Sequence, residues 1–159
     1  MNIKRFPFLL LALILLLSAC QRNATRNGNG SVDVETSITQ QELQEVINGG
    51  IADPLIQELT VSLQSGYILV SGTRQRLNDS SKSDTLSFQL DLSVRDGQLT
   101  ATISNAQFDG FTVEQNRLEL WNTTIANKIT RIAQKSPNSA LTSVSVKPSA
   151  VTMKWTVSK

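Results

Sequence analysis

The 159-residue sequence has no histidine and only one cysteine, Cys20. The lack of histidine excludes Ser-His-Asp and Cys-His catalysis and removes the commonest metal ligand and general base. A single cysteine cannot form an intramolecular disulfide. A glycine-rich phosphate loop is also missing, because Asn27-Gly28-Asn29-Gly30 is typical of a linker and not of a strand-to-helix turn. These absences predict a protein that is not an enzyme and that holds no cofactor and no metal.

Carboxylate pairs could still act as acid and base, as they do in glycosidases. The candidate pairs are Asp91 with Asp96 and Asp79 with Asp84. Their places in loops and on the polar side of an alternating segment favour a solvated surface over a catalytic site. A hydrolase is therefore the weakest of the functional interpretations.

The N-terminus has the organisation of an export signal. Residues 1–5 carry Lys4 and Arg5 and no acid, and residues 6–17 form an apolar run that is broken only by Pro7. Twelve residues of helix cover roughly 18 Å, whereas the hydrocarbon core of a bilayer is about 30 Å thick. The run is too short to cross a membrane and predicts a segment that is removed after export.

The apolar run ends in Leu17-Ser18-Ala19-Cys20. This sequence resembles the lipobox of bacterial lipoproteins, in which small residues precede an invariant cysteine. The resemblance implies that residues 1–19 are a signal peptide and that Cys20 becomes the first residue, carrying lipid and palmitate-type acyl chains. Two or three chains give stable anchoring, at about 0.8 kcal/mol per buried CH₂. The alternative is an ordinary signal peptide that is cut after Ala19 and leaves a free thiol.

Gln21 follows the cysteine, where an aspartate often retains Gram-negative lipoproteins in the inner membrane. The resemblance therefore implies an outer-membrane location in a Gram-negative source, and otherwise the outer face of the cell membrane. Residues 20–30 are predicted to be a lipidated cysteine with a flexible tether, and residues 31–159 a single folded domain.

Charge is balanced in the processed chain. Removing Lys4 and Arg5 from the 15 basic residues leaves 13, which equals the number of acidic residues. This balance argues against nucleic-acid binding, which needs a concentrated basic surface. It also argues against adsorption to a membrane through a polybasic segment.

Hydrophobic periodicity predicts an α+β domain: an antiparallel, curved sheet covered on one face by two amphipathic helices, in the order α-β-β-β-β-α-β-β. Residues 31–37 read as an edge strand or extended lead-in. A capping box, Thr39-Gln40-Gln41-Glu42, predicts the start of the first helix, which is expected to stop near Gly49-Gly50. Strands are then expected at 59–63 and 67–76, followed by a polar loop at 77–83 and by strands at 86–94 and 99–103 around an Arg95-Asp96-Gly97-Gln98 turn. A second capping box, Thr112-Val113-Glu114-Gln115, predicts a helix to about Lys135, and two last strands are expected at 141–147 and 151–157.

The helix at 43–47, the hairpin at 59–70 and the long helix at 118–132 resemble in arrangement the lipid-binding module of tubular lipid-binding (TULIP-like) proteins. The resemblance implies a groove for acyl chains between the long helix and the sheet. Apolar side chains at helical and strand spacing are the candidates to line it, and Tyr67 and Trp155 have polar ends suited to its mouth. The candidate ligand-binding residues are Trp121, Ile125, Ile129, Ile132, Met153, Trp155 and Tyr67.

Two alternatives stay open. The same residues would simply form the core if sheet and helix close fully. The protein would then be a non-catalytic interaction or scaffold module of the cell envelope with a protein partner. Its binding surface would be the 31–37 edge, the 77–83 loop, or the Ser-, Thr- and Gln-rich side of the sheet.

Overall fold

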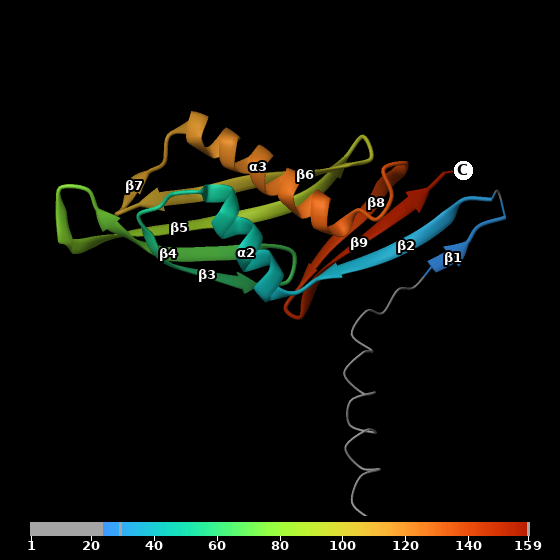
Figure 1. Ribbon diagram of the computed structural model, residues 1–159, viewed down its shortest axis with the longest axis horizontal. Coiled ribbons are helices and arrows are strands. Elements are labelled where there is room, and N and C mark those ends of the chain that lie inside the picture. The colour runs from blue at the N-terminus through green and yellow to red at the C-terminus, as the bar shows by residue number, and fades with distance from the viewer. Residues whose placement is uncertain (1–23, 29, 159) are drawn as a thin grey trace, which may run out of the picture.

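The computed structural model describes residues 24–28 and 30–158, so the predicted signal peptide, Cys20 and Gln21 lie outside the described residues. The described part of the chain forms two helices and nine strands (Figure 1). In chain order they are β1 (Ala24–Arg26), β2 (Val32–Ile38), α2 (Gln40–Ile51), β3 (Ile56–Leu63), β4 (Ile68–Arg76), β5 (Asp79–Arg95), β6 (Gln98–Phe108), β7 (Phe111–Thr112), α3 (Gln115–Ala133), β8 (Ser139–Lys147) and β9 (Ala150–Val157).

The strands form two antiparallel sheets, with the orders β1-β2-β9-β8 and β3-β4-β5-β6-β7. The predicted α+β class with antiparallel strands and two helices is confirmed. The expected single sheet is divided in two, because β8 pairs with β9 and meets the turns at the end of the larger sheet, without pairing along any of its strands. Leu141 N–H donates to the Gly97 carbonyl at 2.8 Å, and Gly66 N–H donates to the Val146 carbonyl at 3.0 Å.

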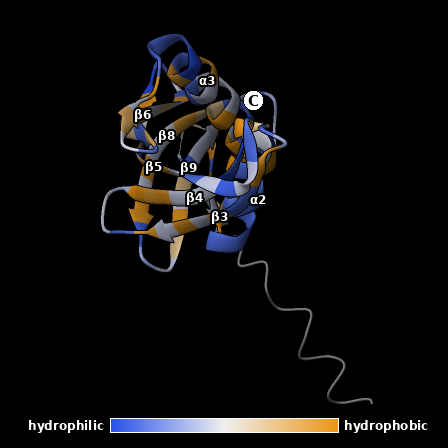
Figure 2. Ribbon diagram, turned by 90° about the vertical axis from the view of Figure 1, so that its left-hand side faces the viewer, coloured by the Kyte–Doolittle hydropathy of each residue, from blue (hydrophilic) through white to orange (hydrophobic). Residues whose placement is uncertain are grey.

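Both helices lie on the same face of the curved strands (Figure 2). Alternation along the strands and the 3.6-residue period of the helices direct apolar side chains into the layer between them. One hydrophobic cluster contains residues from both sheets and both helices. Among its fully buried members are Leu43, Ile47, Ile68, Leu90, Ile125, Ile129 and Met153.

The predicted start of α2 is confirmed. The Glu42 N–H donates to Thr39 Oγ1 at 3.3 Å, and the Thr39 N–H donates to Glu42 Oε2 at 2.8 Å, which completes the capping box. The helix also ends near Gly49-Gly50, as predicted: α2 continues to Ile51, and its C-cap Ala52 has a φ of 49°. Gly50 is the point of closest approach between the helices: a Cβ there would lie 2.7 Å from Ile125 Cγ1.

Two local predictions near the helices and hairpins are wrong. Glu114, and not Thr112, precedes α3, and no side chain caps that helix. Thr112 lies in β7, where it pairs with Gln107 of β6, and is therefore not at the start of the helix. Residues 79–83 are not a polar loop, because they begin β5 and Ser83 pairs with Gln75 of β4.

Residues 31–37 are not an edge strand, because β2 pairs with β9 along its whole length and with β1 at Val32–Val34. The segment predicted to be a flexible tether thus contains a strand, β1. Hydrogen bonds from Thr156, and then from Asn27, lower the pKa of the Asp33 carboxyl in this hairpin. The folded part of the chain therefore includes β1 and does not begin at residue 31.

We expect Gly50→Ala to reduce the free energy of unfolding by about 1–3 kcal/mol, because its methyl group would overlap the Ile125 side chain. Gly49→Ala is the matched control. Its Cβ would meet the mobile end of Lys128 at 3.3 Å, and alanine in a helix is favoured over glycine by roughly 0.5–1 kcal/mol. Urea unfolding of both variants tests this difference, and a Gly50→Ala variant as stable as Gly49→Ala would contradict the close helix crossing.

Candidate functional site

Most of the side chains predicted to line a ligand groove lie in the core. Trp121, Ile125, Ile129, Met153 and Trp155 are at most 5% exposed. The Trp121 ring lies 6.2 Å from that of Phe88, and Trp155 Nε1 donates to Thr36 Oγ1 at 3.0 Å. This burial agrees with the alternative in which the apolar stripe forms the core.

The other two predicted residues lie apart from this cluster. Ile132 is 39% exposed and borders a depression between α2 and α3 together with Val46 and Lys128. Tyr67 is half-buried beside the β3–β4 turn, where its carbonyl accepts a hydrogen bond from Gln64 N–H. The structure therefore does not bring the seven predicted residues together around one open groove.

An open groove lies elsewhere, between α3 and the edge of β6. It consists of two adjoining depressions that share Leu99 and Asn127 in their linings. We call it the α3–β6 groove. The side chains of α3 and of its C-cap Gln134 form one wall: Glu119, Asn122, Thr123, Ala126, Asn127, Thr130 and Gln134. The opposite wall and far end are formed by Asp96–Ala101, Pro137, Ser139, Ala140 and Trp155.

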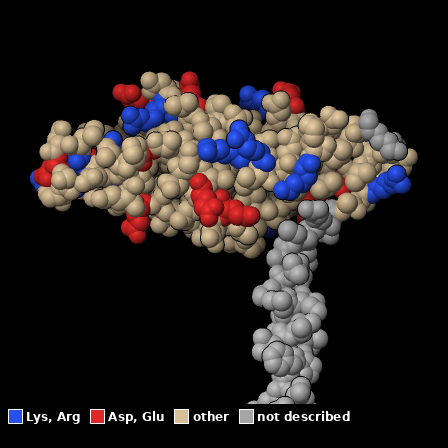
Figure 3. Space-filling model, viewed as in Figure 1, with Lys and Arg blue, Asp and Glu red and all other residues tan. Residues whose placement is uncertain are grey.

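Hydroxyl and amide groups dominate this lining, and its charged members are both acidic. Asp96 lies at the β5–β6 turn and Glu119 near the start of α3. Fifteen residues of helix separate Glu119 from Gln134, so the groove follows α3 for about 22 Å. Elsewhere on the helix-bearing face, basic and acidic side chains are interspersed (Figure 3). The groove is thus a long, polar, weakly acidic channel.

The β6 wall of the groove is an open strand edge. On its far side β6 pairs with β5, whereas on the groove side β7 reaches only Gln107 and Phe108, so among the described residues no strand flanks 99–105 there. The Ile103 N–H points into the groove and donates to Asn122 Oδ1 at 2.8 Å. Because backbone groups alternate along a strand, the N–H and C=O groups of Leu99 and Ala101 point the same way.

The β5–β6 turn that closes one end of this edge was correctly predicted. Asp96 and Gly97 both have positive φ, 52° and 74°, as a two-residue type I′ hairpin requires. The groove itself was not predicted, because the candidate site was assigned to the apolar side chains of the long helix and not to its polar ones. The available signal was the spacing of Asn122, Ala126 and Asn127, which places two amides and a small residue on one side of the helix.

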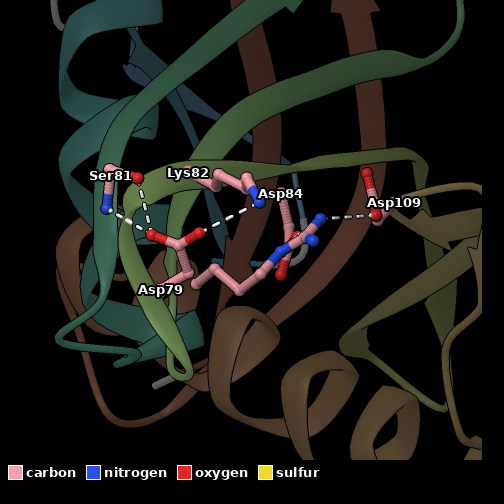
Figure 4. A network of polar contacts seen from close by, with 6 residues as sticks. Asp79, Ser81, Lys82, Asp84 and Asp109 are labelled. Carbon is pink, nitrogen blue, oxygen red and sulfur yellow. Dashed lines mark hydrogen bonds and ion pairs between the residues drawn. The ribbon is translucent and has the colours of Figure 1, made fainter.

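A polar network occupies the end of the larger sheet where β4, β5 and β6 approach one another (Figure 4). Arg76 Nε donates to Asp84 Oδ1 at 2.8 Å, and its Nη2 lies 2.6 Å from the same oxygen and 3.1 Å from Asp109 Oδ2. The bond to Asp84 raises the pKa of Arg76. The prediction that Asp84 lies on a solvated surface is wrong: only 8% of it is exposed, because this hydrogen-bonded cation compensates its burial.

A third carboxylate, that of Asp79, is also held in its anionic form. Asp79 accepts hydrogen bonds from the Ser81 hydroxyl at 2.6 Å and from Ser81 N–H at 3.1 Å, and it pairs with Lys82 at 3.0 Å. The bonds to Ser81 and Lys82 lower the pKa of Asp79. A general acid needs the opposite shift, so the network has the character of a structural ion-pair cluster.

No family model, curated protein or solved structure that was compared with the chain matches it. Within residues 24–28 and 30–158, no helix is long and apolar enough to span a membrane, and no cluster of three or more His, Cys, Asp or Glu side chains could hold a metal ion.

We expect Arg76→Gln and Asp84→Asn each to lower the thermal unfolding midpoint, and the double variant to lose less than the sum of the two. Removing Arg76 alone leaves a buried carboxylate without its cation, whereas the double variant leaves a neutral pair. Asp79→Asn is the control on the same strand. Its pair with the exposed Lys82 should contribute little, and strictly additive losses would show that Asp84 does not depend on Arg76.

Proposed function

We propose that the protein is an exported lipoprotein that is anchored to a membrane through lipid on Cys20 and is not an enzyme. The lipobox-like Leu17-Ser18-Ala19-Cys20 and the short apolar run before it support the anchor. β1 begins at Ala24, four residues after Cys20. At about 3.5 Å per residue the domain would then lie within about 14 Å of its lipid. An outer-membrane location is proposed for a Gram-negative source.

We further propose that the α3–β6 groove is the binding site of this lipoprotein. The observation that carries this proposal is an exposed strand edge that runs beside a long helix with a polar, open lining. A segment of an envelope protein fits this lining better than an acyl chain does. Acyl chains gain affinity from apolar contact, and here the buried apolar side chains of α3, such as Ile125 and Ile129, belong to the core, while the exposed Ile132 lies outside the groove.

A hydrophobic ligand remains the second candidate function because Trp155 borders one end of the same groove. Trp155 is 3% exposed and belongs to the core cluster. A lipid that entered there would have to open the core cluster in order to reach Met153 and the rest of the apolar stripe. This candidate therefore requires a conformational change that the protein-segment proposal does not.

Replacing Cys20 tests the anchor. Cys20→Ser should abolish incorporation of labelled palmitate when the full chain is expressed in a bacterium, because the thiol is the acceptor. Ser18→Ala keeps a small residue in the lipobox and should be labelled as the unchanged protein is. Equal labelling of the Cys20→Ser variant would contradict anchoring at this residue.

A photo-crosslinking amino acid at Asn127 tests the groove. Asn127 lines both depressions, whereas Asn116 lies on the same helix outside them and is the matched control. In cells we expect a discrete protein adduct from position 127, none from position 116, and loss of the adduct when Thr123→Trp fills the groove. A lipid-sized adduct would favour the hydrophobic ligand, and identical patterns at both positions would exclude the groove as the site.

A further inference from the structure

We propose that the α3–β6 groove binds an extended peptide segment of a partner protein as an additional β-strand on the edge of β6. This inference rests on the proposed function and specifies how its site works. Strand addition takes affinity from main-chain hydrogen bonds and specificity from alternate side chains. The groove offers both a free main-chain edge and a wall that alternate side chains would meet.

The groove-side edge of β6 has backbone groups free to pair with a further strand, and among the described residues no strand pairs with that edge at 99–103. Leu99 and Ala101 direct their N–H and C=O groups into the groove, and the next donor in that row, Ile103 N–H, is bonded to Asn122 Oδ1. The side chains of these three residues are buried on the core side. A bound segment would therefore meet backbone groups along β6. Asn122 Oδ1 now occupies the place where a carbonyl of that segment would accept a hydrogen bond from Ile103 N–H.

The edge of β3, at the opposite side of the same sheet, differs from that of β6. There Gln44 of α2 accepts a hydrogen bond from Val61 N–H at 3.4 Å, and α2 packs against β3. The β6 edge, by contrast, combines outward backbone groups with an open channel beside a helix.

Size and charge define the segment that fits. Residues 99–103 offer about 16 Å of edge, and the whole channel of about 22 Å accepts roughly six or seven extended residues. At the centre the lining includes Ala101 and Ala126, whose small side chains leave room beside the strand edge. Asp96 and Glu119 are the charged groups of the lining, one near each end. The partner segment that fits best therefore has basic ends and a centre of β-branched residues, which favour the extended conformation.

The test uses the peptide acetyl-KTVTVTK-amide and the full-length processed lipoprotein in detergent micelles, with amide exchange read by NMR. At a peptide concentration ten times its Kd we expect exchange at Leu99 and Ala101 to slow by about tenfold, because a bound amide must be released before it exchanges. Acetyl-ETVTVTE-amide controls for the basic ends. The same basic peptide with its five central nitrogens methylated controls for main-chain bonding. Neither should protect these two amides.

Asn122→Ala provides a second measurement that loss of folding cannot imitate. It frees Ile103 N–H, so the basic peptide should bind this variant about three- to tenfold more tightly and should then also protect Ile103. Unchanged exchange at Leu99 and Ala101 with several millimolar peptide, in both the unchanged protein and Asn122→Ala, would overturn strand addition. Protection by the methylated peptide would overturn it as well.

Partner binding in the groove and strand addition to β6 can be tested separately. If position 127 still gives a protein adduct in cells but the peptide protects neither Leu99 nor Ala101, the groove binds a partner without strand addition. If position 127 gives no specific adduct and the peptide does not bind, the proposed site is wrong as well.

Discussion

The position of α3 depends on the contact between Gly50 and Ile125, where the two helices cross with no room for a side chain. Ile125 is fully buried in the core, so the helix is fixed from two directions. The apolar side of α3 packs against the sheet and α2, and polar side chains of α3 lie along the edge of β6. The groove is therefore a consequence of how the core is packed, and it is held by rigid elements rather than by a loop.

The fold class was predictable because its signals are local and repeated. Alternation along β5 and the Thr39–Glu42 capping box each depend on neighbours in the sequence, and the structure agrees with both. The predictions that were wrong depend on distant partners. Thr112 has the sequence of a helix cap but pairs with Gln107, and the polar residues that begin β5 are held in a strand by β4. Tertiary pairing overrides local preference at such positions.

The candidate site was less predictable than the fold for a related reason. Periodicity identifies Trp121, Ile125 and Ile129 as one apolar face, but it cannot distinguish a face that closes on a sheet from one that leaves a ligand groove. The groove found in the structure is formed by the opposite kind of residue. Asn122 and Ile103 are 19 positions apart, and nothing in either local sequence indicates that an amide on a helix meets a strand edge.

An unpaired strand edge is a hazard for a folded protein, because it can pair with any extended chain. Asn122 reduces this hazard by occupying one backbone donor, and it does so with a side chain that can rotate away. The same arrangement suits reversible recognition, since a partner must exchange only one existing hydrogen bond in order to add its own.

Strand addition of a short peptide is weak in dilute solution. Anchoring through Cys20, as proposed, would confine the groove near the membrane, and a partner held in that membrane would experience a high effective concentration. Tethering would thus let a weak, exposed edge act selectively on neighbours in the same envelope while it stays unoccupied elsewhere.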